Sequence, residues 1–402
     1  MISTILILQG LMAICSPDQI PVKSGADRPD HYLPVIGSLR IALVANHTSV
    51  VGERHLVDTL LASGISKEQI VKVFAPEHGF RGDRAAGVKV EDGTDPVTGI
   101  PVVSLYGSNK KPGADVLEGI EMVVFDLQDV GTRFYTYIST LHYVMEACAE
   151  NDIPLMVLDR PNPNGGYVDG PVLDLAFASF VGMHRIPVVY GLTMGELAGM
   201  INGEGWLKGG VHCDLTVIPC EGYFHEKFIS LPVSPSPNLT SDHAIRLYPS
   251  TCFFEGTVMS EGRGTDTPFE VYGHPDLPGN FSFTPEEIPG VARNPKFEGQ
   301  TCYGGDLRDF VPEEGWNRLR LQWLLEAYRA FPHKEKFFTS YFDKLAGTDA
   351  LRIQIEAGWD EKRIRATWQD ELEQYNTVRE KYLIYNENKW SFPGDRCSPY
   401  PA

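Results

Sequence analysis

Short apolar runs alternate with amphipathic segments through the first part of this chain. The runs are nearly continuous, as in strands that are buried on both faces of a sheet. They lie at residues 39–45, 70–74, 101–105, 121–125 and 153–158. Apolar residues at helical spacing fall between them at residues 56–62 and 137–149. This order predicts an α/β fold with a mostly parallel sheet and helices on both faces.

The pattern changes after about residue 249. Loops rich in Gly and Pro, such as residues 272–279 and 294–305, replace the alternation, and two amphipathic helices follow at residues 316–331 and about 360–385. Apolar residues share one face of the last helix, and we interpret them as core. They are Ile364, Trp368, Leu372, Tyr375, Val378 and Tyr382.

These two patterns predict two domains. A Rossmann-like, mostly parallel sheet domain is expected over residues 30–245, and a smaller α+β domain over residues 246–402. Ligands commonly bind in the cleft between two domains, so we place the active-site cleft there.

The first 15 residues are mostly apolar but too few to cross a bilayer as an ordinary helix. They resemble the apolar core of a secretory signal, and Cys15 ends a stretch that loosely resembles a bacterial lipoprotein signal. We therefore expect a signal or lipoprotein-like segment at residues 1–20 and export to the periplasm or cell envelope. Membrane attachment would come only through an N-terminal lipid. The alternative is a packed or disordered N-terminal segment.

Composition and motifs narrow the classes of ligand. The net charge of −18 argues against binding a phosphate backbone, so we expect no nucleic-acid partner. The sequence has neither the GxGxxG nor the GxxxxGK[ST] loop that cradles phosphates, so no nucleotide is expected. Its seven cysteines form no CxxC pair. We expect no cofactor and no metal, and a neutral or mixed-charge ligand fits best.

Polar clusters follow four of the predicted strands. They occupy residues 46–48, 77–79, 126–129 and 159–164. The carboxyl ends of strands in an open parallel sheet share one edge, and ligands bind at that edge. Any one cluster is explained equally well as loop chemistry, but the four together predict a site.

Carboxylates are the main chemical resource at this edge. Glu77 follows a buried strand and lies near the ring of Phe80, a setting suited to a general acid. Asp126 and Asp129 are further catalytic candidates. Two alternatives are open: Glu77 is only a helix-capping acid, or the aspartates bind a metal with His47 and His78, as in a metal-dependent hydrolase.

Four arginines accompany these acids: Arg81, Arg133, Arg160 and Arg263. Arginine suits bidentate binding of a carboxylate, so the pattern favours a substrate with an acidic group. The alternative is that some of them form ion pairs with the aspartates. Beyond the sheet, Glu255, Arg263 and Asp266 lie among glycines, and we expect these loops to fold over the edge of the first domain.

Several of these segments form an ordered set that resembles a known family over about residues 35–402. The matching stretches are Pro76 to Gly82, Asp126 to Tyr137, Asp159 to Pro163, Pro235 to Asn238, Tyr248 to Ser250, Phe254 to Thr257 and Gly262 to Asp266. The set resembles the NamZ-like exo-β-N-acetylmuramidase family, formerly a domain of unknown function (DUF1343). Each stretch is short, but their order is specific.

The resemblance implies the same two-domain fold and an exo-acting glycoside hydrolase. Such an enzyme would release terminal N-acetylmuramic acid from the non-reducing ends of peptidoglycan-derived muropeptides or disaccharides. The family's proposed catalytic glutamate falls on Glu77. Asp126, Asp129 or Glu255 would activate water or stabilise the oxocarbenium ion, unless the substrate's 2-acetamido group acts as nucleophile.

The lactyl carboxylate of muramic acid would explain arginines beside a glycosidase acid, and we expect Arg133, Arg160 or Arg263 to bind it. The full set of expected substrate-binding residues is Asn46, His78, Arg81, Gln128, Arg133, Tyr135, Asp159, Arg160, Asn162, Glu255, Arg263 and Asp266. The rival interpretations are a metal-dependent hydrolase of another cell-wall ester or amide, and a non-catalytic cell-wall sugar-binding protein.

Overall fold

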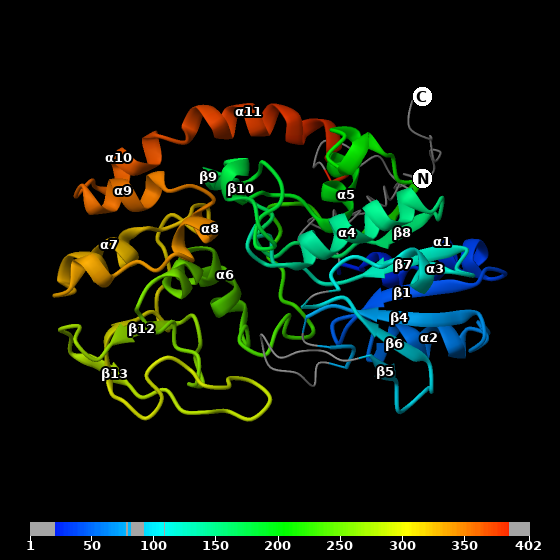
Figure 1. Ribbon diagram of the computed structural model, residues 1–402, viewed down its shortest axis with the longest axis horizontal. Helices are drawn as coiled ribbons and strands as arrows, with labels where there is room; N and C mark the ends of the chain where they lie inside the picture. Colours follow the sequence, from blue (N-terminus) through cyan, green and yellow to red (C-terminus); the bar gives the residue numbers. More distant parts are fainter. Residues whose placement is uncertain (1–20, 78, 82–91, 108, 386–402) are drawn as a thin grey trace, which may run out of the picture.

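The structure is a computed structural model that describes residues 21–77, 79–81, 92–107 and 109–385 (Figure 1). The expected signal segment at residues 1–20 and the candidate His78 lie outside these ranges, so both stay predictions. Within the described ranges, no helix combines the length and the apolar character needed to cross a membrane.

A seven-stranded sheet forms the first part of the chain, in the order β11-β8-β7-β1-β4-β6-β5. Its strands are β1 (Ile41–Ala45), β4 (Ile70–Ala75), β5 (Gly93–Thr94), β6 (Pro101–Ser104), β7 (Met122–Asp126), β8 (Leu155–Leu158) and β11 (Leu215–Ile218). Every pairing is parallel except that of β5 with β6. The strand order reverses between β7 and β1, as in a Rossmann-like sheet, which confirms the predicted fold class.

Helices cover both faces of this sheet (Figure 1). They are α1 (Pro29–Ile36), α2 (Leu56–Ala62), α3 (Ala114–Leu117), α4 (Tyr137–Glu150) and α5 (Met194–Gly203). Along β1, Ala42 and Val44 pack in the core that contains α3, α4 and α5, whereas Ile41 and Leu43 pack in the core that contains α1 and α2. Burial of alternate residues on opposite faces explains why the strands are apolar throughout.

Shorter elements lie between the main strands and helices of both parts. Two antiparallel pairs are β2 (Val50–Val51) with β3 (Arg54–His55), and β9 (Asp169–Val172) with β10 (Pro187–Val189). The 3₁₀ turns described are Gly25–Asp27, Leu175–Phe177, Lys208–Gly210, Cys252–Gly256, Lys334–Lys336 and Glu380–Tyr382.

The second part combines a small antiparallel sheet with helices, as predicted for an α+β unit. The sheet has the order β12-β14-β13, with β12 (Val271–His274), β13 (Phe281–Phe283) and β14 (Cys302–Asp306). The helices are α6 (Asp242–Thr251), α7 (Gln322–Ala330), α8 (Phe342–Ala346), α9 (Ala350–Glu356), α10 (Glu361–Ala366) and α11 (Gln369–Arg379).

Two expectations for this part were wrong. The segments at 272–279 and 294–305, interpreted as loops, contribute to β12 and β14. Their glycines obscure the strand pattern because the strands pair so closely that a Cβ at Gly304 would lie 1.9 Å from the carbonyl oxygen of Tyr272. The single helix expected at 316–331 begins only at Gln322.

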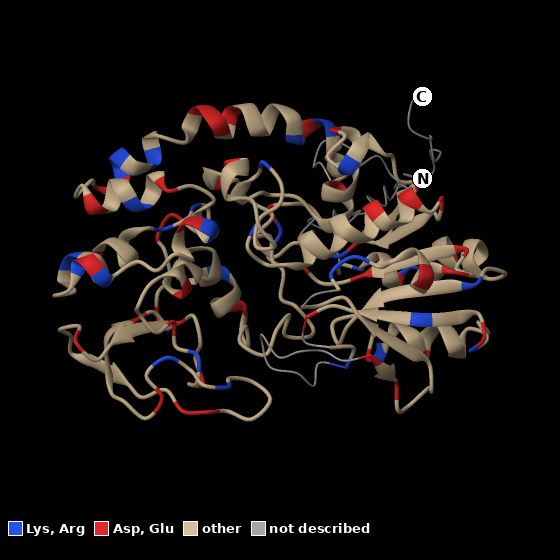
Figure 2. Cartoon of the chain, in the orientation of Figure 1, with Lys and Arg blue, Asp and Glu red and all other residues tan. Residues whose placement is uncertain are grey.

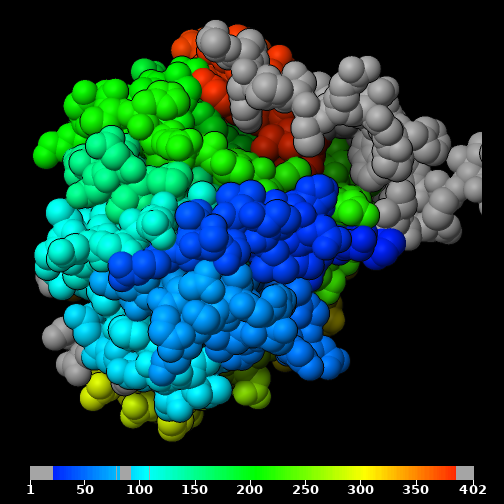
Figure 3. All heavy atoms as spheres, turned by 90° about the vertical axis from the view of Figure 1, so that its right-hand side faces the viewer, coloured from blue at the N-terminus to red at the C-terminus, as the bar shows by residue number. Residues whose placement is uncertain are grey.

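The helix expected at 360–385 is divided into α10, α11 and a 3₁₀ turn, and its apolar face is largely buried. That face packs on the first part of the chain. The indole of Trp368 donates to Asp169 at 3.2 Å, and the hydroxyl of Tyr375 donates to the carbonyl oxygen of Tyr190 at 2.6 Å. Figure 1 shows α11 spanning both halves, and Figure 3 shows the described residues that follow α11 (red) against the green segment that contains α5, where the Glu380–Tyr382 turn contacts α5. The C-terminal chain therefore fixes the two halves together.

Charged residues are distributed over both halves. Figure 2 shows Lys and Arg interspersed with Asp and Glu throughout the described chain. This mixture favours a neutral or mixed-charge ligand, as the composition indicated.

Candidate active site

A pocket of about 190 Å³ lies where the carboxyl edge of the large sheet meets the second part of the chain. Glu77 lines it from the end of β4, and Thr136 from the start of α4. Glu255, Arg263 and Tyr341 line it from the second part. The pocket therefore joins residues that are far apart in sequence, as expected for a cleft between two domains.

Glu77 is placed by the end of its strand. β4 ends at Ala75, Pro76 cannot continue the ladder, and Gly79 takes the left-handed conformation (φ 77°) that turns the chain away. The side chain is half-buried. The hydroxyl of Tyr106 donates to its Oε1 at 3.1 Å, and that of Thr136 donates to its Oε2 at 3.4 Å. These hydroxyls orient both carboxyl oxygens in the pocket.

Glu255 lies in the 3₁₀ turn that follows α6. Arg263 donates from Nη2 to its Oε1 at 2.7 Å, and Nε of Arg263 lies 3.2 Å from Oε1 of Glu261. Burial raises the pKa of Glu255. The positive charge of Arg263 lowers this pKa, and the negative charge of Glu261 raises it further. The same two glutamates hold the pKa of Arg263 above its ordinary value despite burial.

Arg263 is presented by the glycines on either side of it. Gly262 and Gly264 have φ of 80° and 83°, a left-handed backbone that side chains with a Cβ rarely adopt. The concentration of charge among glycines in the sequence thus corresponds to a tight turn that directs Arg263 to the pocket wall.

Aromatic rings form most of the remaining wall. They are Tyr106, Phe134, Tyr135, Tyr137, Phe180, Tyr248, Phe269 and Tyr341. Tyr135 and Tyr137 meet edge to face with ring centroids 5.0 Å apart, and Tyr135 also donates to the carbonyl oxygen of Pro235 at 2.6 Å. Rings of this kind provide apolar faces and hydroxyls, a combination that suits the faces and edges of a sugar.

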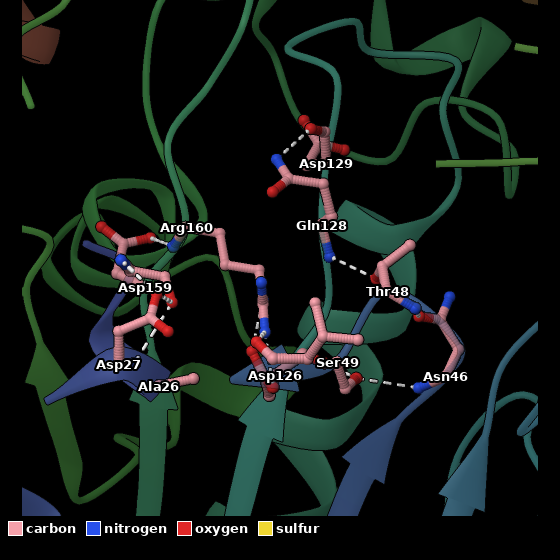
Figure 4. Close-up of polar contacts among 12 residues, drawn as sticks. Ala26, Asp27, Asn46, Thr48, Ser49, Asp126, Gln128, Asp129, Asp159 and Arg160 are labelled. Carbon is pink, nitrogen blue, oxygen red and sulfur yellow. Dashed lines mark hydrogen bonds and ion pairs between the residues drawn. The ribbon is translucent and has the colours of Figure 1, made fainter. Parts of the chain in front are cut away.

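Asp126 and Arg160 form a buried ion pair instead of lining the pocket. Asp126 is the last residue of β7 and Arg160 follows the neighbouring strand β8, and Figure 4 shows the two side chains facing each other beside Asp27. Arg160 donates from Nε to Oδ1 at 2.5 Å and from Nη2 to Oδ2 at 2.9 Å, and Nη2 also contacts the carbonyl oxygen of Val50 at 2.9 Å. The two side chains therefore bind each other at the edge of the sheet, and neither lines the pocket.

Asp129 and Asp159 are also buried in networks behind the pocket. Asp129 accepts from the hydroxyl of Tyr190 and from the backbone N–H of Gly131, and burial raises its pKa to about 6. Asp159 accepts from Thr193 at 2.6 Å and from other donors, and burial raises its pKa to about 6 as well. Neither carboxyl group lines the pocket.

The amide candidates at this edge have similar roles. Asn46 donates to the hydroxyl of Tyr137 at 2.7 Å, so it supports the pocket wall from behind. Gln128 donates to two backbone carbonyls, one of them that of Pro161 at 2.7 Å, and Asn162 donates to the carbonyl oxygen of Leu192 at 2.9 Å. Figure 4 shows Gln128 between Thr48 and Asp129.

Arg133 is fully buried and contacts no carboxylate that the structure describes. Its two terminal nitrogens donate to four backbone carbonyls. The acceptors are Pro171 (2.8 Å), Ile186 (2.7 Å), Leu345 (3.1 Å) and Ala346 (2.6 Å). Burial lowers the pKa of Arg133 to about 9, so it stays charged at neutral pH. Arg133 therefore ties the first part of the chain to α8.

The other candidates lie outside the pocket lining. Arg81 forms ion pairs with Asp95 at 2.8 Å and Asp58 at 3.2 Å, and Asp266 is exposed. Of the site residues expected from sequence, the pocket brings together Glu77, Tyr135, Glu255 and Arg263.

Sequence reasoning missed Tyr106, Thr136, Tyr137, Tyr248 and Tyr341. Tyr106 follows the third predicted strand directly, so the strand-end argument applied to residues 101–105 would have found it. Tyr341 precedes α8 in the second part and carries no local signal.

Larger cavities lie elsewhere. One of about 460 Å³ is lined by β9, α9 and α11, with Asp174, Arg185 and Trp368 in its wall. Another of about 460 Å³ is lined by Asp27, Arg160 and residues 227–230. Neither includes Glu77 or Glu255, so the smaller pocket is the candidate active site. No group of three or more His, Cys, Asp or Glu side chains within the described ranges is placed to hold a metal ion.

The fold and the pocket define a class. This is a two-domain α/β protein with two glutamates in an aromatic-walled pocket between the domains, and paired carboxylates are the groups that most glycosidases use. A family model described as "Exo-beta-N-acetylmuramidase NamZ, N-terminal" matches residues 41–243, and its C-terminal counterpart matches residues 246–385. The chain belongs to the exo-β-N-acetylmuramidase NamZ family.

Relatives agree with this membership. The chain is 38% identical over 386 residues to the peptidoglycan β-N-acetylmuramidase NamZ of Bacillus subtilis (strain 168). This match covers 90% of this chain and 91% of that protein. Two DUF1343 family proteins of Bacteroides fragilis have similar structures. One has a TM-score of 0.84 at 44% identity and the other 0.76 at 28%, and each match covers 92% of this chain and 100% of the other.

Proposed function

We propose that this protein is an exo-acting glycoside hydrolase that releases terminal N-acetylmuramic acid from the non-reducing ends of peptidoglycan fragments. The observation that carries the proposal is the meeting of Glu77 and Glu255, one from each domain, in a single aromatic-walled pocket with Arg263. Family membership and the peptidoglycan β-N-acetylmuramidase of Bacillus subtilis support the same substrate class.

Glu77 is the general acid and base in this proposal. It protonates the leaving glycosidic oxygen, which departs as a hydroxyl group, and afterwards takes up a new proton from water. Tyr106 and Thr136 hold its two oxygens, and a hydroxyl can accept as well as donate a hydrogen bond. The two hydroxyls can therefore serve both protonation states of Glu77 without a change in its position.

Glu255 is the second carboxylate. Its pKa is raised from the ordinary value, which brings a general base closer to neutral pH, where base catalysis is most efficient. It would activate water or stabilise the oxocarbenium ion across the sugar from Glu77. Asp126 and Asp129, the other two candidates, are held in buried networks away from the pocket, so the geometry favours Glu255.

Arg263 is the proposed partner of the lactyl carboxylate. Of the three arginines considered for this role, Arg133 and Arg160 are buried on protein acceptors, and Arg263 lines the pocket. Its contacts with carboxylates in the described chain use Nη2 and Nε, and Nη1 offers two further N–H donors for a ligand.

The direct test uses a disaccharide fragment with N-acetylmuramic acid at its non-reducing end and a second with the sugars in reverse order. Mass spectrometry should detect free N-acetylmuramic acid from the first fragment only. The activity should survive a chelator, which distinguishes this proposal from a metal-dependent hydrolase. Binding of both fragments without cleavage would instead support a sugar-binding protein and overturn the proposal.

We also propose that the chain is exported, because residues 1–15 are mostly apolar. Fractionation of cells that express the full chain should place it in the cell envelope or periplasm. If Cys15 carries a lipid, Cys15→Ser will move the protein from the membrane to the soluble fraction. Recovery of the unmodified full-length chain in the cytosol would contradict export.

A further inference from the structure

Lys296 lies in the second domain and contacts the backbone of the segment that carries Glu255. Its Nζ is within hydrogen-bond distance of four carbonyl oxygens and one carboxylate. They belong to Phe254 (3.1 Å), Glu255 (3.4 Å), Thr257 (3.2 Å), Met259 (2.8 Å) and Glu261 (Oε2, 3.2 Å). An ammonium group has three N–H donors, so these oxygens share its hydrogen bonds and its positive charge.

This convergence determines the shape of the pocket wall. Carbonyl oxygens that point at one place repel one another unless a positive charge lies between them. In residues 254–261 the charge comes from Lys296, which is 35 to 42 residues away in the sequence. The segment therefore depends on a distant side chain for the conformation that directs Glu255 and Arg263 into the pocket.

The backbone around Lys296 is also unusual. Asn294 and Phe297 have φ of 49° and 62°, a left-handed conformation that residues other than glycine seldom adopt. Pro295 packs against Gly264, where an added Cβ would lie 2.7 Å from the proline Cγ. One such residue lies on each side of Lys296, and a backbone of this kind persists only where the surrounding structure holds it in place. Local strain of this kind concentrates at functional sites.

Charges alternate from Lys296 to the pocket. Its ammonium contacts Glu261, Glu261 contacts Arg263, and Arg263 contacts Glu255. The charge of Lys296 lowers the pKa of Glu255 and so opposes the effect of burial. Among the described residues, the titratable groups that interact with Glu255 include Arg263, Glu261, Lys296, Tyr248, Cys252 and Tyr341.

We propose that Lys296 is a positioning residue for the reaction: its ammonium group organises residues 254–261 so that Glu255 and Arg263 face the substrate. The inference rests on the proposed function, because it assigns Lys296 to the same pocket. Lys296 is not in the pocket lining, so it acts through the segment and not on the substrate.

The test compares pH–rate profiles of kcat/KM for the wild type, Lys296→Gln and Lys296→Arg. Lys336→Gln serves as the matched control, since Lys336 is an exposed lysine of the same domain. A pH–rate profile of Glu255→Gln is measured as well, and the limb that disappears in this variant is assigned to the titration of Glu255. In Lys296→Gln this limb should move to higher pH, and kcat should fall about tenfold or more while KM changes less, as expected when a group poised for the transition state is displaced.

Lys296→Arg separates charge from shape. A guanidinium keeps the positive charge but is planar and larger than an ammonium. The limb should therefore stay near its wild-type pH while kcat falls. If Lys296→Gln does not fold, Lys296→Arg alone tests the inference. A wild-type kcat in Lys296→Arg, or a shift of its Glu255 limb to another pH, would overturn the inference.

The two proposals fail in different ways. A wild-type protein that cleaves no muramic acid fragment contradicts the proposed function. An active wild type, with a Lys296→Gln variant whose kcat and pH limb match those of Lys336→Gln, contradicts the role of Lys296 alone.

Discussion

The guanidinium of Arg263 donates from Nη2 to Oε1 of Glu255 at 2.7 Å, and both side chains line the pocket that contains Glu77. The second domain thus supplies a paired carboxylate and guanidinium to a pocket whose other carboxylate comes from the sheet edge. Both parts of the chain are therefore needed to form the pocket, and the ion pair is the first target for substitution.

Replacement of Arg263 by Met should reduce discrimination between substrates. We expect kcat/KM for an N-acetylmuramide to fall by about 30-fold or more, since loss of a hydrogen-bonded charge partner costs about 2–5 kcal/mol. The value for the matching N-acetylglucosaminide, which has no lactyl carboxylate, should fall less. Arg263→Lys keeps a positive charge and should retain part of the preference. An unchanged ratio of the two kcat/KM values in Arg263→Met would exclude Arg263 as the lactyl partner.

Arg133→Met should destabilise the protein without changing its specificity. The substitution removes a donor from four buried carbonyls, of which that of Ile186 still accepts from the N–H of Leu173 at 3.1 Å, and each group left unsatisfied costs about 1–3 kcal/mol. Urea unfolding should show a loss of about 3 kcal/mol or more. The control is Arg185→Met, because Arg185 pairs with Glu371 in an exposed contact of 3.4 Å that is worth less than about 1 kcal/mol. Equal losses in the two variants would contradict the structural role of Arg133.

Asp126→Asn should unfold more readily because it leaves Arg160 buried without its countercharge. Breaking a buried pair in this way costs about 3–5 kcal/mol. The double variant Asp126→Leu with Arg160→Met removes both charges and should recover part of that loss, as measured by urea unfolding. A stable Asp126→Asn variant with abolished kcat would instead favour the catalytic role that the sequence indicated for Asp126.

Asp129 should give the protein a measurable pH dependence of stability. The folded carboxyl holds its proton up to about pH 6, whereas its ordinary pKa is 3.8. The folded state therefore binds more protons between these values, so the free energy of unfolding falls as pH rises from 3.8 through about 6. A shift of this size corresponds to about 3 kcal/mol.

Asp129→Asn removes that contribution. The free energy of unfolding of the variant should fall less steeply from pH 4 to pH 6 than that of the wild type. Asp159 has a similarly raised pKa, and burial lowers the pKa of His184 to about 3, but both are present in the two proteins and cancel in the comparison. Parallel curves would contradict the assignment to Asp129.

The parallel sheet was predictable because its strands are buried on both faces and so appear as continuous apolar runs. Glu77 was found for the same reason, since it follows one of these runs. The strand-end argument could not separate Glu77 from Asp126, because the difference depends on the partner of each carboxylate. Arg160 follows the neighbouring strand and forms an ion pair with Asp126. A sequence pattern shows where side chains emerge but not which of them pair.

The second domain was harder to predict. Its strands contain glycines that allow close pairing, so β14 lacks the alternation of apolar residues that marks a strand. The contribution of Lys296 gave no local signal either, because its partners lie at residues 254–261. Glu255 and Arg263 were recognisable from the glycines around them, and the structure shows that these glycines form the turn that presents Arg263.

The central claim is that Glu77 performs acid–base catalysis on a muramic acid glycoside. The most direct test measures chromogen release from an N-acetylmuramide and its N-acetylglucosaminide counterpart by the wild type and by Glu77→Gln. The wild type should cleave the muramide in preference, and Glu77→Gln should be slower by about 10²–10⁴-fold, the range that positioned proton transfer contributes. Equal release from the two sugars, or release by Glu77→Gln at the wild-type rate, would contradict the account.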